Sequence, residues 1–215
     1  MADWRPDLLI IDGDFFDFYY MSRFAEHDVA FDKADALSTD YRRGREELDF
    51  FLSVCGKVMF REGNHEFRLQ KRREKYPELW SLLEIDKQLE LADRGIEYSS
   101  ELDEPIQLGP QLAVTHGWYY NKYHTNKTLI EYGGSVIYGH VHHHQLDSRY
   151  VKADKRVITV FSNPCLTDVD PEFFKGRPTR HTNGFTTLYM DRSGFFYPTI
   201  IQMNDNSFIF EGRRY

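Results

Sequence analysis

The chain has 215 residues, of which 41% are hydrophobic and 28% charged, and this composition excludes a disordered, collagen-like or coiled-coil protein. Its 27 Lys and Arg residues against 34 Asp and Glu residues give a net charge of −7, so no overall positive field attracts nucleic acid or anionic lipid. The length favours one domain over residues 1–215, and no apolar run reaches the ~18 residues of a membrane-spanning helix. Two cysteines, Cys55 and Cys165, fit packing roles in a reducing compartment, so we expect a cytoplasmic protein.

Short apolar runs alternate with helical patterns in the first part of the chain. Residues 8–11 predict a buried strand that ends at Asp12-Gly13-Asp14, and a helix capped by Ser38 or Thr39 is expected after it. Further strands are predicted at 58–60, 112–114 and 136–138, and further helices at 67–75, 77–91 and 122–132, the last closed by Gly133. This alternation predicts an α/β fold.

After residue 145 the pattern becomes β-type. Strands are predicted at 156–161, 185–190, 195–201 and 207–210, separated by turns at Ser193-Gly194 and Asp205-Asn206. The stretch 163–183 contains prolines and has no clear period, and we interpret it as a long ordered loop of the kind that is often functional.

Residues able to bind a metal ion follow several of these strands. They are Asp14, Asn64, His116, His140 and His142. Because the carboxyl ends of strands in α/β sheets meet at one edge, we expect these side chains to converge. Imidazole, amide and carboxylate ligands favour Mn²⁺, with Fe, Zn²⁺ or Ni²⁺ as alternatives, over Ca²⁺.

Four motifs, in this order, resemble those of the calcineurin-like metallophosphoesterases. They are Gly13-Asp14-Phe15-Phe16-Asp17, Gly63-Asn64-His65-Glu66, Thr115-His116-Gly117 and Gly139-His140-Val141-His142. The later stretches 163–166, 171–173 and 183–185 are similar to the tail of phage-type members. The resemblance implies a four-layer α/β/β/α sandwich that hydrolyses a phosphomonoester or phosphodiester by attack of a metal-bound hydroxide.

The resemblance also assigns roles to individual residues. Its metal ligands are Asp14 between two cations, Asn64, His116 and His140 on one cation, and His142 on the other. His65 would stand beside the leaving-group oxygen as general acid or transition-state stabiliser, oriented by Glu66. Asp17 would support these residues from outside the coordination shell, and Arg68 is a candidate contact for the substrate phosphate.

One motif of the family has no counterpart. The family carries an Asp-x-His after its first strand, whereas the first histidine of this chain is His27, after Asp14. One explanation is that the natural protein begins upstream with a further βα unit of about 25–35 residues, and two cations are then expected. Otherwise the chain is a one-metal enzyme, or one in which the loop of Glu26, His27 and Asp28 supplies ligands. A third alternative is a binding protein that kept the fold and lost the chemistry.

The partners expected are a phosphate-ester substrate and no membrane. A nuclease acting on DNA or RNA is a further alternative, disfavoured by the net charge of −7. The choice between monoester and diester, the native metal and the oligomeric state stay open. Among the other histidines, His124 is expected at the surface, His143 and His144 away from the site, and His181 either exposed or lining a pocket.

Overall fold

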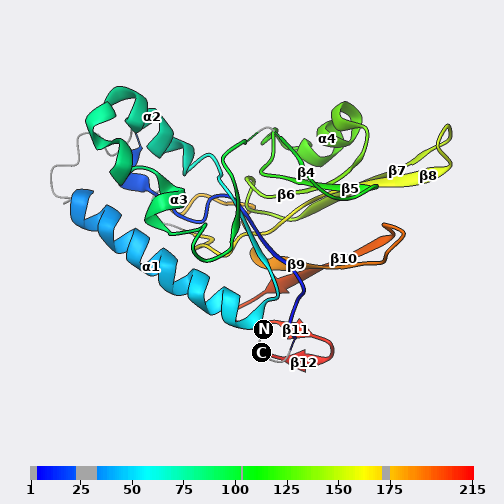
Figure 1. The fold of residues 1–215 in the computed structure, drawn as a ribbon. Coiled ribbons are helices and arrows are strands. Elements are labelled where there is room, and N and C mark those ends of the chain that lie inside the picture. The colour runs from blue at the N-terminus through cyan, green and yellow to red at the C-terminus, as the bar shows by residue number, and fades with distance from the viewer. Residues whose placement is uncertain (1–3, 23–32, 103, 171–174) are drawn as a thin grey trace. The chain divides into compact units, whose positions relative to one another are not determined.

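The computed structural model describes residues 4–22, 33–102, 104–170 and 175–215, and Glu26, His27, Asp28 and the 171–173 stretch lie outside these ranges. The chain divides into two compact units, Met1–Leu102 and Asp103–Tyr215. Helices and both parallel and antiparallel strand pairs occur, so the predicted mixed α/β class is confirmed (Figure 1). Within the described ranges, no helix combines the length and the apolar character needed to cross a membrane. The single domain and the four-layer sandwich stay predictions.

The first unit contains a parallel sheet with the strand order β1–β2–β3. Its strands are β1 (Leu9–Asp12), β2 (Val58–Arg61) and β3 (Glu97–Ser99). Its helical elements are η1 (Tyr19–Met21), α1 (Lys33–Val54), α2 (Phe67–Lys75), η3 (Pro77–Leu82) and α3 (Ile85–Gln88). The predicted strands at 8–11 and 58–60 and the helix at 67–75 are therefore confirmed.

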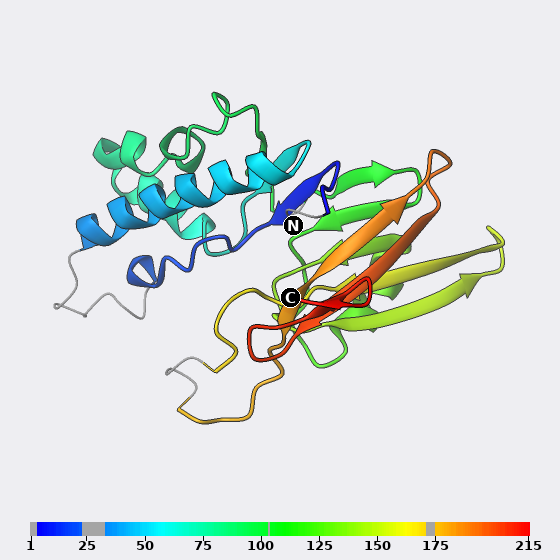
Figure 2. The same cartoon turned by 90° about the horizontal axis from the view of Figure 1, so that it is seen from below.

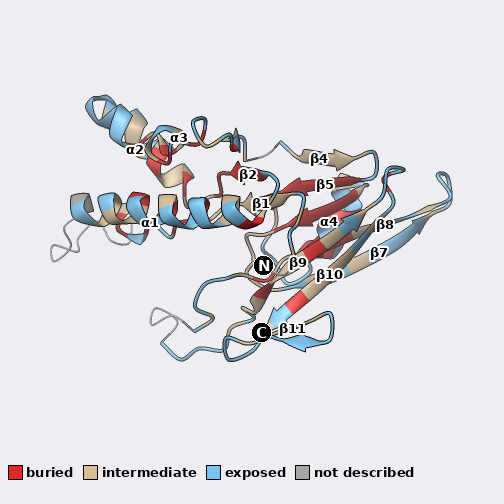
Figure 3. Ribbon diagram, turned by 60° about the horizontal axis from the view of Figure 1, so that its bottom comes forward, coloured by how far each residue is buried: buried red, intermediate tan, exposed pale blue. Residues whose placement is uncertain are grey.

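One face of α1 builds the core of this unit. Tyr41, Gly44 and Leu48 recur at the three- and four-residue spacing that keeps side chains on one side of a helix, and all are buried. They belong to an aromatic-rich cluster that includes Phe16 and Phe18, while the opposite face of α1 is exposed (Figure 3). Complete burial of a side chain such as Leu48 stabilises the fold by about 2 kcal/mol.

Two helix predictions in this unit are wrong in their bounds. Helix α1 begins at Lys33, ahead of Ser38, because the Ala- and Leu-containing run before Ser38 consists of good helix formers. The predicted helix 77–91 is broken at Glu84, whose backbone is extended. Leu83 and Ile85 are both buried, and residues two positions apart point to opposite sides of a helix, so the chain unwinds between them.

The second unit contains a five-stranded mixed sheet with the order β4–β5–β6–β8–β7 and a long antiparallel pair of β9 with β10 (Figure 2). The sheet strands are β4 (Ile106–Gly109), β5 (Leu112–Thr115), β6 (Ser135–Tyr138), β7 (Gln145–Val151) and β8 (Arg156–Ser162). The remaining strands are β9 (Asn183–Met190), β10 (Phe196–Met203), β11 (Ile209–Phe210) and β12 (Arg213–Arg214).

Strands β5 and β6 are parallel neighbours at the centre of this unit. All their residues are buried, as expected of short apolar runs covered on both faces (Figure 3). Helix α4 (His124–Tyr132) connects them and packs Leu129 against Val136 and other buried residues of the sheet. The helix ends at Gly133, whose φ of 71° a residue without a side chain adopts readily. The carboxyl ends of β5 and β6 therefore lie next to each other, which positions the residues that follow them.

Gly44→Ala tests the packing of α1. Alanine normally stabilises a helix interior by about 1 kcal/mol relative to glycine. Here its Cβ would overlap Cζ of Phe16 and lie 3.1 Å from Cδ2 of Leu89, inside an aromatic cluster that leaves the ring little room to move. We expect the free energy of unfolding to fall by about 1–3 kcal/mol, measured by urea denaturation. Arg43→Ala, at an exposed position of the same helix, should change it by less than about 0.5 kcal/mol. A Gly44→Ala protein more stable than wild type would contradict this packing.

Candidate metal centre

The carboxylate of Glu66 joins the two loops that carry the predicted ligands of the first unit. Its Oε2 accepts hydrogen bonds from the backbone N–H groups of Asp14 at 2.9 Å and Gly63 at 2.7 Å, and its Oε1 accepts one from Phe16 at 2.9 Å. The residue is 1% exposed. Burial, reinforced by the Asp14 carboxylate, raises the pKa of Glu66 to about 7, although the backbone donors act against this shift. Glu66 thus fixes the loop after β1 to the turn before α2.

The His65 ring contacts Asp17, and this is where the structure differs from the role expected of Glu66. Nδ1 of His65 lies 3.2 Å from Oδ1 of Asp17, and its Nε2 lies 4.0 Å from Oδ2 of Asp14. The backbone N–H of His65 donates to Oδ1 of Asp14 at 2.9 Å. The hydrogen bond with His65 lowers the pKa of Asp17, against the effect of burial. Asp17 therefore orients the His65 ring. Glu66 instead fixes the backbone of the two loops that carry Asp17 and His65.

Arg68 and Asn64 stand on either side of His65 in the chain. The Arg68 guanidinium donates to the carbonyl oxygen of Asp17 and lies 3.7 Å from its carboxylate, with a quarter of the side chain exposed. Arg68 therefore braces Asp17 and still presents donors to solvent. Asn64 occupies the turn between β2 and α2, immediately before His65. The first unit thus brings together Asp14, His65 and Asp17.

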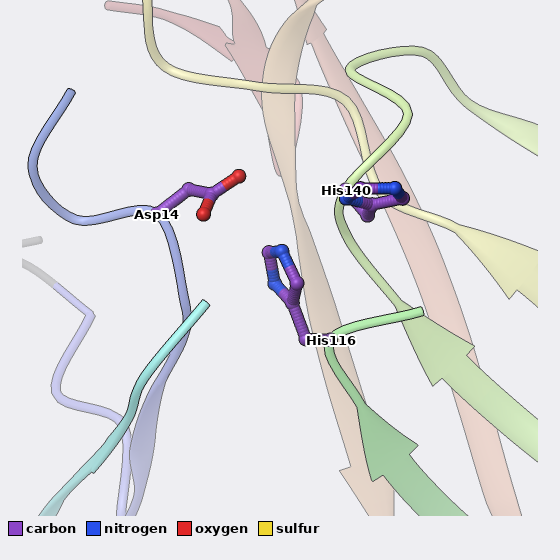
Figure 4. Close-up of side chains that lie close together, drawn as sticks. All are labelled: Asp14, His116 and His140. Carbon is purple, nitrogen blue, oxygen red and sulfur yellow. The ribbon is translucent and has the colours of Figure 1, made fainter. Parts of the chain in front are cut away.

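His116 and His140 lie side by side in the second unit. They follow the neighbouring strands β5 and β6, whose last residues Thr115 and Tyr138 are paired in the parallel register. The ring centroids of the two histidines are 5.2 Å apart with an interplanar angle of 67° (Figure 4). His116 is 3% exposed. The expected convergence of these two side chains is observed within this unit.

Left-handed backbone occurs at three of the predicted ligands. The φ angles are 52° at Asp14, 65° at His140 and 60° at His142. Residues other than glycine adopt this conformation at a cost, and such strain is concentrated at functional sites. At Gly117 the φ is 121°, and an added Cβ would lie 3.1 Å from Cβ of His140, so this glycine permits the close approach of the two histidine loops.

His142 packs against His181, a residue of the long loop whose role the sequence leaves open. Their ring centroids are 4.8 Å apart at an interplanar angle of 62°. The backbone N–H of Thr182 donates to the carbonyl oxygen of His142 at 2.8 Å, which seats the loop beside the histidine run. Burial lowers the pKa of His181, and His142 and His143 lower it further. The structure places His181 next to a predicted ligand.

His124 is fully buried, so its predicted surface position is wrong. Its Nδ1 bonds the Tyr138 hydroxyl, and its Nε2 lies 3.3 Å from Nε2 of His143, whose Nδ1 lies 3.4 Å from the Val141 carbonyl oxygen. One set of protons satisfies this chain: Tyr138 donates to His124, His124 to His143, and His143 to the backbone. This series of hydrogen bonds ends at Val141, the residue between His140 and His142, and so supports the loop that carries both histidines.

His116 and His140 are two imidazoles of the second unit that could hold a metal ion (Figure 4). Imidazole ligands suit Zn²⁺, Fe and Mn²⁺, and the two neutral rings can bind without losing a proton. The donors therefore fit the class of cation that the sequence predicts.

No protein-family model matches the chain, and no curated protein matches it. The fold and the site define a mixed α/β protein with a candidate metal centre at His116 and His140. Function is inferred from the motifs and from the geometry of each unit.

Sequence reasoning missed the contacts of His124 and His181. Helical spacing alone does not show whether His124 faces the sheet or solvent, because the sequence does not show which face of α4 packs on the sheet. His181 lies 39 positions after His142, and hydrogen bonds of its neighbour Thr182 to His142 and His144 hold it near them. A histidine just before the strand-like run at 183–190 was the one available signal.

Glu66→Gln tests the connection between the two loops of the first unit. The amide keeps the shape of the side chain but turns a donor toward backbone N–H groups, so buried donors lose their acceptor. We expect unfolding to become easier by about 1–3 kcal/mol in urea denaturation. Glu74→Gln, at an exposed position of α2, is the matched control and should leave the urea midpoint unchanged. An unchanged midpoint for Glu66→Gln as well would refute the role of this carboxylate.

The buried imidazole of His124 predicts a loss of stability in mild acid. Burial, together with the nearby His143 and Arg180, lowers the pKa of His124 to about 4 from an ordinary value of 6.5. The unfolded chain therefore takes up a proton below pH 6.5 that the folded chain excludes, so this part of the stability is complete above pH 6.5 and falls as the pH approaches 4. We expect His124→Gln to reduce the drop in melting temperature between pH 7 and pH 5. The exposed His144→Gln should retain the full drop, and an equal drop in all three proteins would contradict the assignment.

Proposed function

We propose that the chain is a metal-dependent phosphoesterase of the calcineurin-like metallophosphoesterase kind, with that family's four-layer sandwich. In this proposal Asp14 completes a cation site with His116 and His140, and Asn64 is a further ligand. The observation that carries the proposal is the imidazole pair of His116 and His140 at the ends of adjacent parallel strands. The order of the four motifs supports it independently.

The donor set fits a divalent cation such as Mn²⁺. When bound, such a cation supplies Lewis acidity, which polarises a phosphoryl oxygen and makes water a better nucleophile near neutral pH. Asp14 contributes negative charge to the site, and His116 and His140 contribute neutral nitrogen ligands. The two loops that carry the imidazoles are held by the packed sheet beneath them, so little reorganisation is needed on binding.

His65 has the surroundings of a general acid. Asp17 accepts a hydrogen bond from Nδ1 of His65, which fixes the ring and leaves Nε2 on the opposite edge. A ring protonated on both nitrogens donates its Nε2 proton to the leaving-group oxygen of the ester, and Asp17 stabilises the positive charge until then. The exposed part of the Arg68 guanidinium is available to a phosphate oxygen.

Hydrolysis of aryl phosphates in the presence of Mn²⁺ tests the proposal. We expect the protein to cleave p-nitrophenyl phosphate or bis(p-nitrophenyl) phosphate, with Mn²⁺ increasing the rate. His65→Ala should lower kcat by about 10²–10⁴-fold while the Mn²⁺ dissociation constant stays within about twofold, because His65 moves a proton and holds no cation. His116→Ala should weaken Mn²⁺ binding itself.

The controls separate turnover from binding. His144→Ala, an exposed histidine of the same loop region, should leave both the rate and the Mn²⁺ affinity unchanged. Binding of Mn²⁺ that depends on His116, without hydrolysis of either ester, would replace the enzyme by the alternative of a binding protein. A rate equal in wild type and His65→Ala would remove His65 from the reaction.

A further inference from the structure

We propose that His181 is a metal ligand and that, with His142, it holds a second divalent cation within the second unit. No motif in the sequence contains His181. The proposal deepens the proposed phosphoesterase function and rests on it for its biological meaning. The residues that carry it, however, all belong to one unit, and its test does not require hydrolysis.

The His142–His181 pair repeats the geometry of the His116–His140 pair. The ring centroids are 4.8 Å apart at 62° in the first and 5.2 Å apart at 67° in the second. The pair His124–His143 is different, because its rings are at 85° and its nitrogens face each other at 3.3 Å in a hydrogen bond. One loop therefore contributes a histidine to each of two imidazole pairs of matching geometry, His140 to the first and His142 to the second.

The backbone holds His181 in this position. Thr182 donates its N–H to the His142 carbonyl oxygen at 2.8 Å, and its own carbonyl oxygen accepts from the N–H of Cys165 at 2.9 Å. On the other side, the N–H of His181 donates to Oγ1 of Thr179 at 3.1 Å. His181 is thus fixed on both sides, and β9 begins two residues later at Asn183.

The left-handed backbone of His142 adds an independent observation. The φ angle is 60° at His142 and 65° at His140, so the backbone is left-handed at both residues. The two imidazoles, only two residues apart, contact different partners, His116 for His140 and His181 for His142. Two imidazoles are a ligand set for borderline cations such as Zn²⁺, Co²⁺ and Mn²⁺, and they leave further coordination positions for water or a phosphate oxygen.

Metal stoichiometry tests the assignment without a substrate. Equilibrium dialysis with Co²⁺, followed by elemental analysis, should give two ions per chain for wild type and one for His181→Ala. His142→Ala should also lose one ion, and the double variant His142→Ala/His181→Ala should lose no more than either single variant. His144→Ala is the matched control and should keep two ions. Circular dichroism establishes that each variant is folded before its metal content is compared.

The visible spectrum of bound Co²⁺ identifies which site is lost. His181→Ala should remove one component of the spectrum and leave the component that His116→Ala removes. A His181→Ala protein that binds as many ions as wild type with the same affinity would overturn the proposal, whether or not the protein hydrolyses esters. Loss of one ion in His181→Ala, in a protein that hydrolyses no ester, would instead refute the phosphoesterase and keep His181 as a ligand.

Discussion

The parallel pairing of β5 with β6 is the constraint on which the candidate metal centre depends. The pairing of Thr115 with Tyr138 places His116 and His140 at the same edge of the sheet, although they are 24 positions apart in sequence. Both strands are buried along their whole length, so the edge that carries the two histidines stands on packed backbone. Gly117 then allows the loops to approach, because a side chain there would meet His140.

Buried polar groups position the site residues in both units. In the first unit a carboxylate, Glu66, accepts from the backbone of two loops and leaves Asp14 and His65 in fixed places. In the second unit a chain of hydrogen bonds from Tyr138 through His124 and His143 reaches the loop between the two ligand histidines. Such groups are costly to bury unless each is satisfied, and satisfied networks favour a single arrangement. The left-handed backbone at the ligands is maintained against its strain by this surrounding structure.

The sequence predicts the local features of this protein well and the contacts between distant residues poorly. The strands before Asp14 and His116 and the charged helix from Phe67 follow from short patterns of apolar and charged residues, and they are observed. The break at Glu84 was not predicted, because the burial of both Leu83 and Ile85 that excludes one continuous helix is known only from the structure. The partners of Glu66 could not be predicted either. Its backbone donors lie up to 52 positions away, and no sequence pattern shows which carboxylate accepts from them. His181 could not be assigned for the same reason.

The proposed metal centre requires that the imidazoles of His116 and His140 bind one cation together. Anomalous diffraction from crystals soaked in Mn²⁺ tests it most directly, because the signal locates the metal irrespective of activity. We predict an anomalous peak within bonding distance of one ring nitrogen each of His116 and His140. A Mn²⁺-soaked crystal with peaks elsewhere and none within bonding distance of these two side chains would contradict the metal centre.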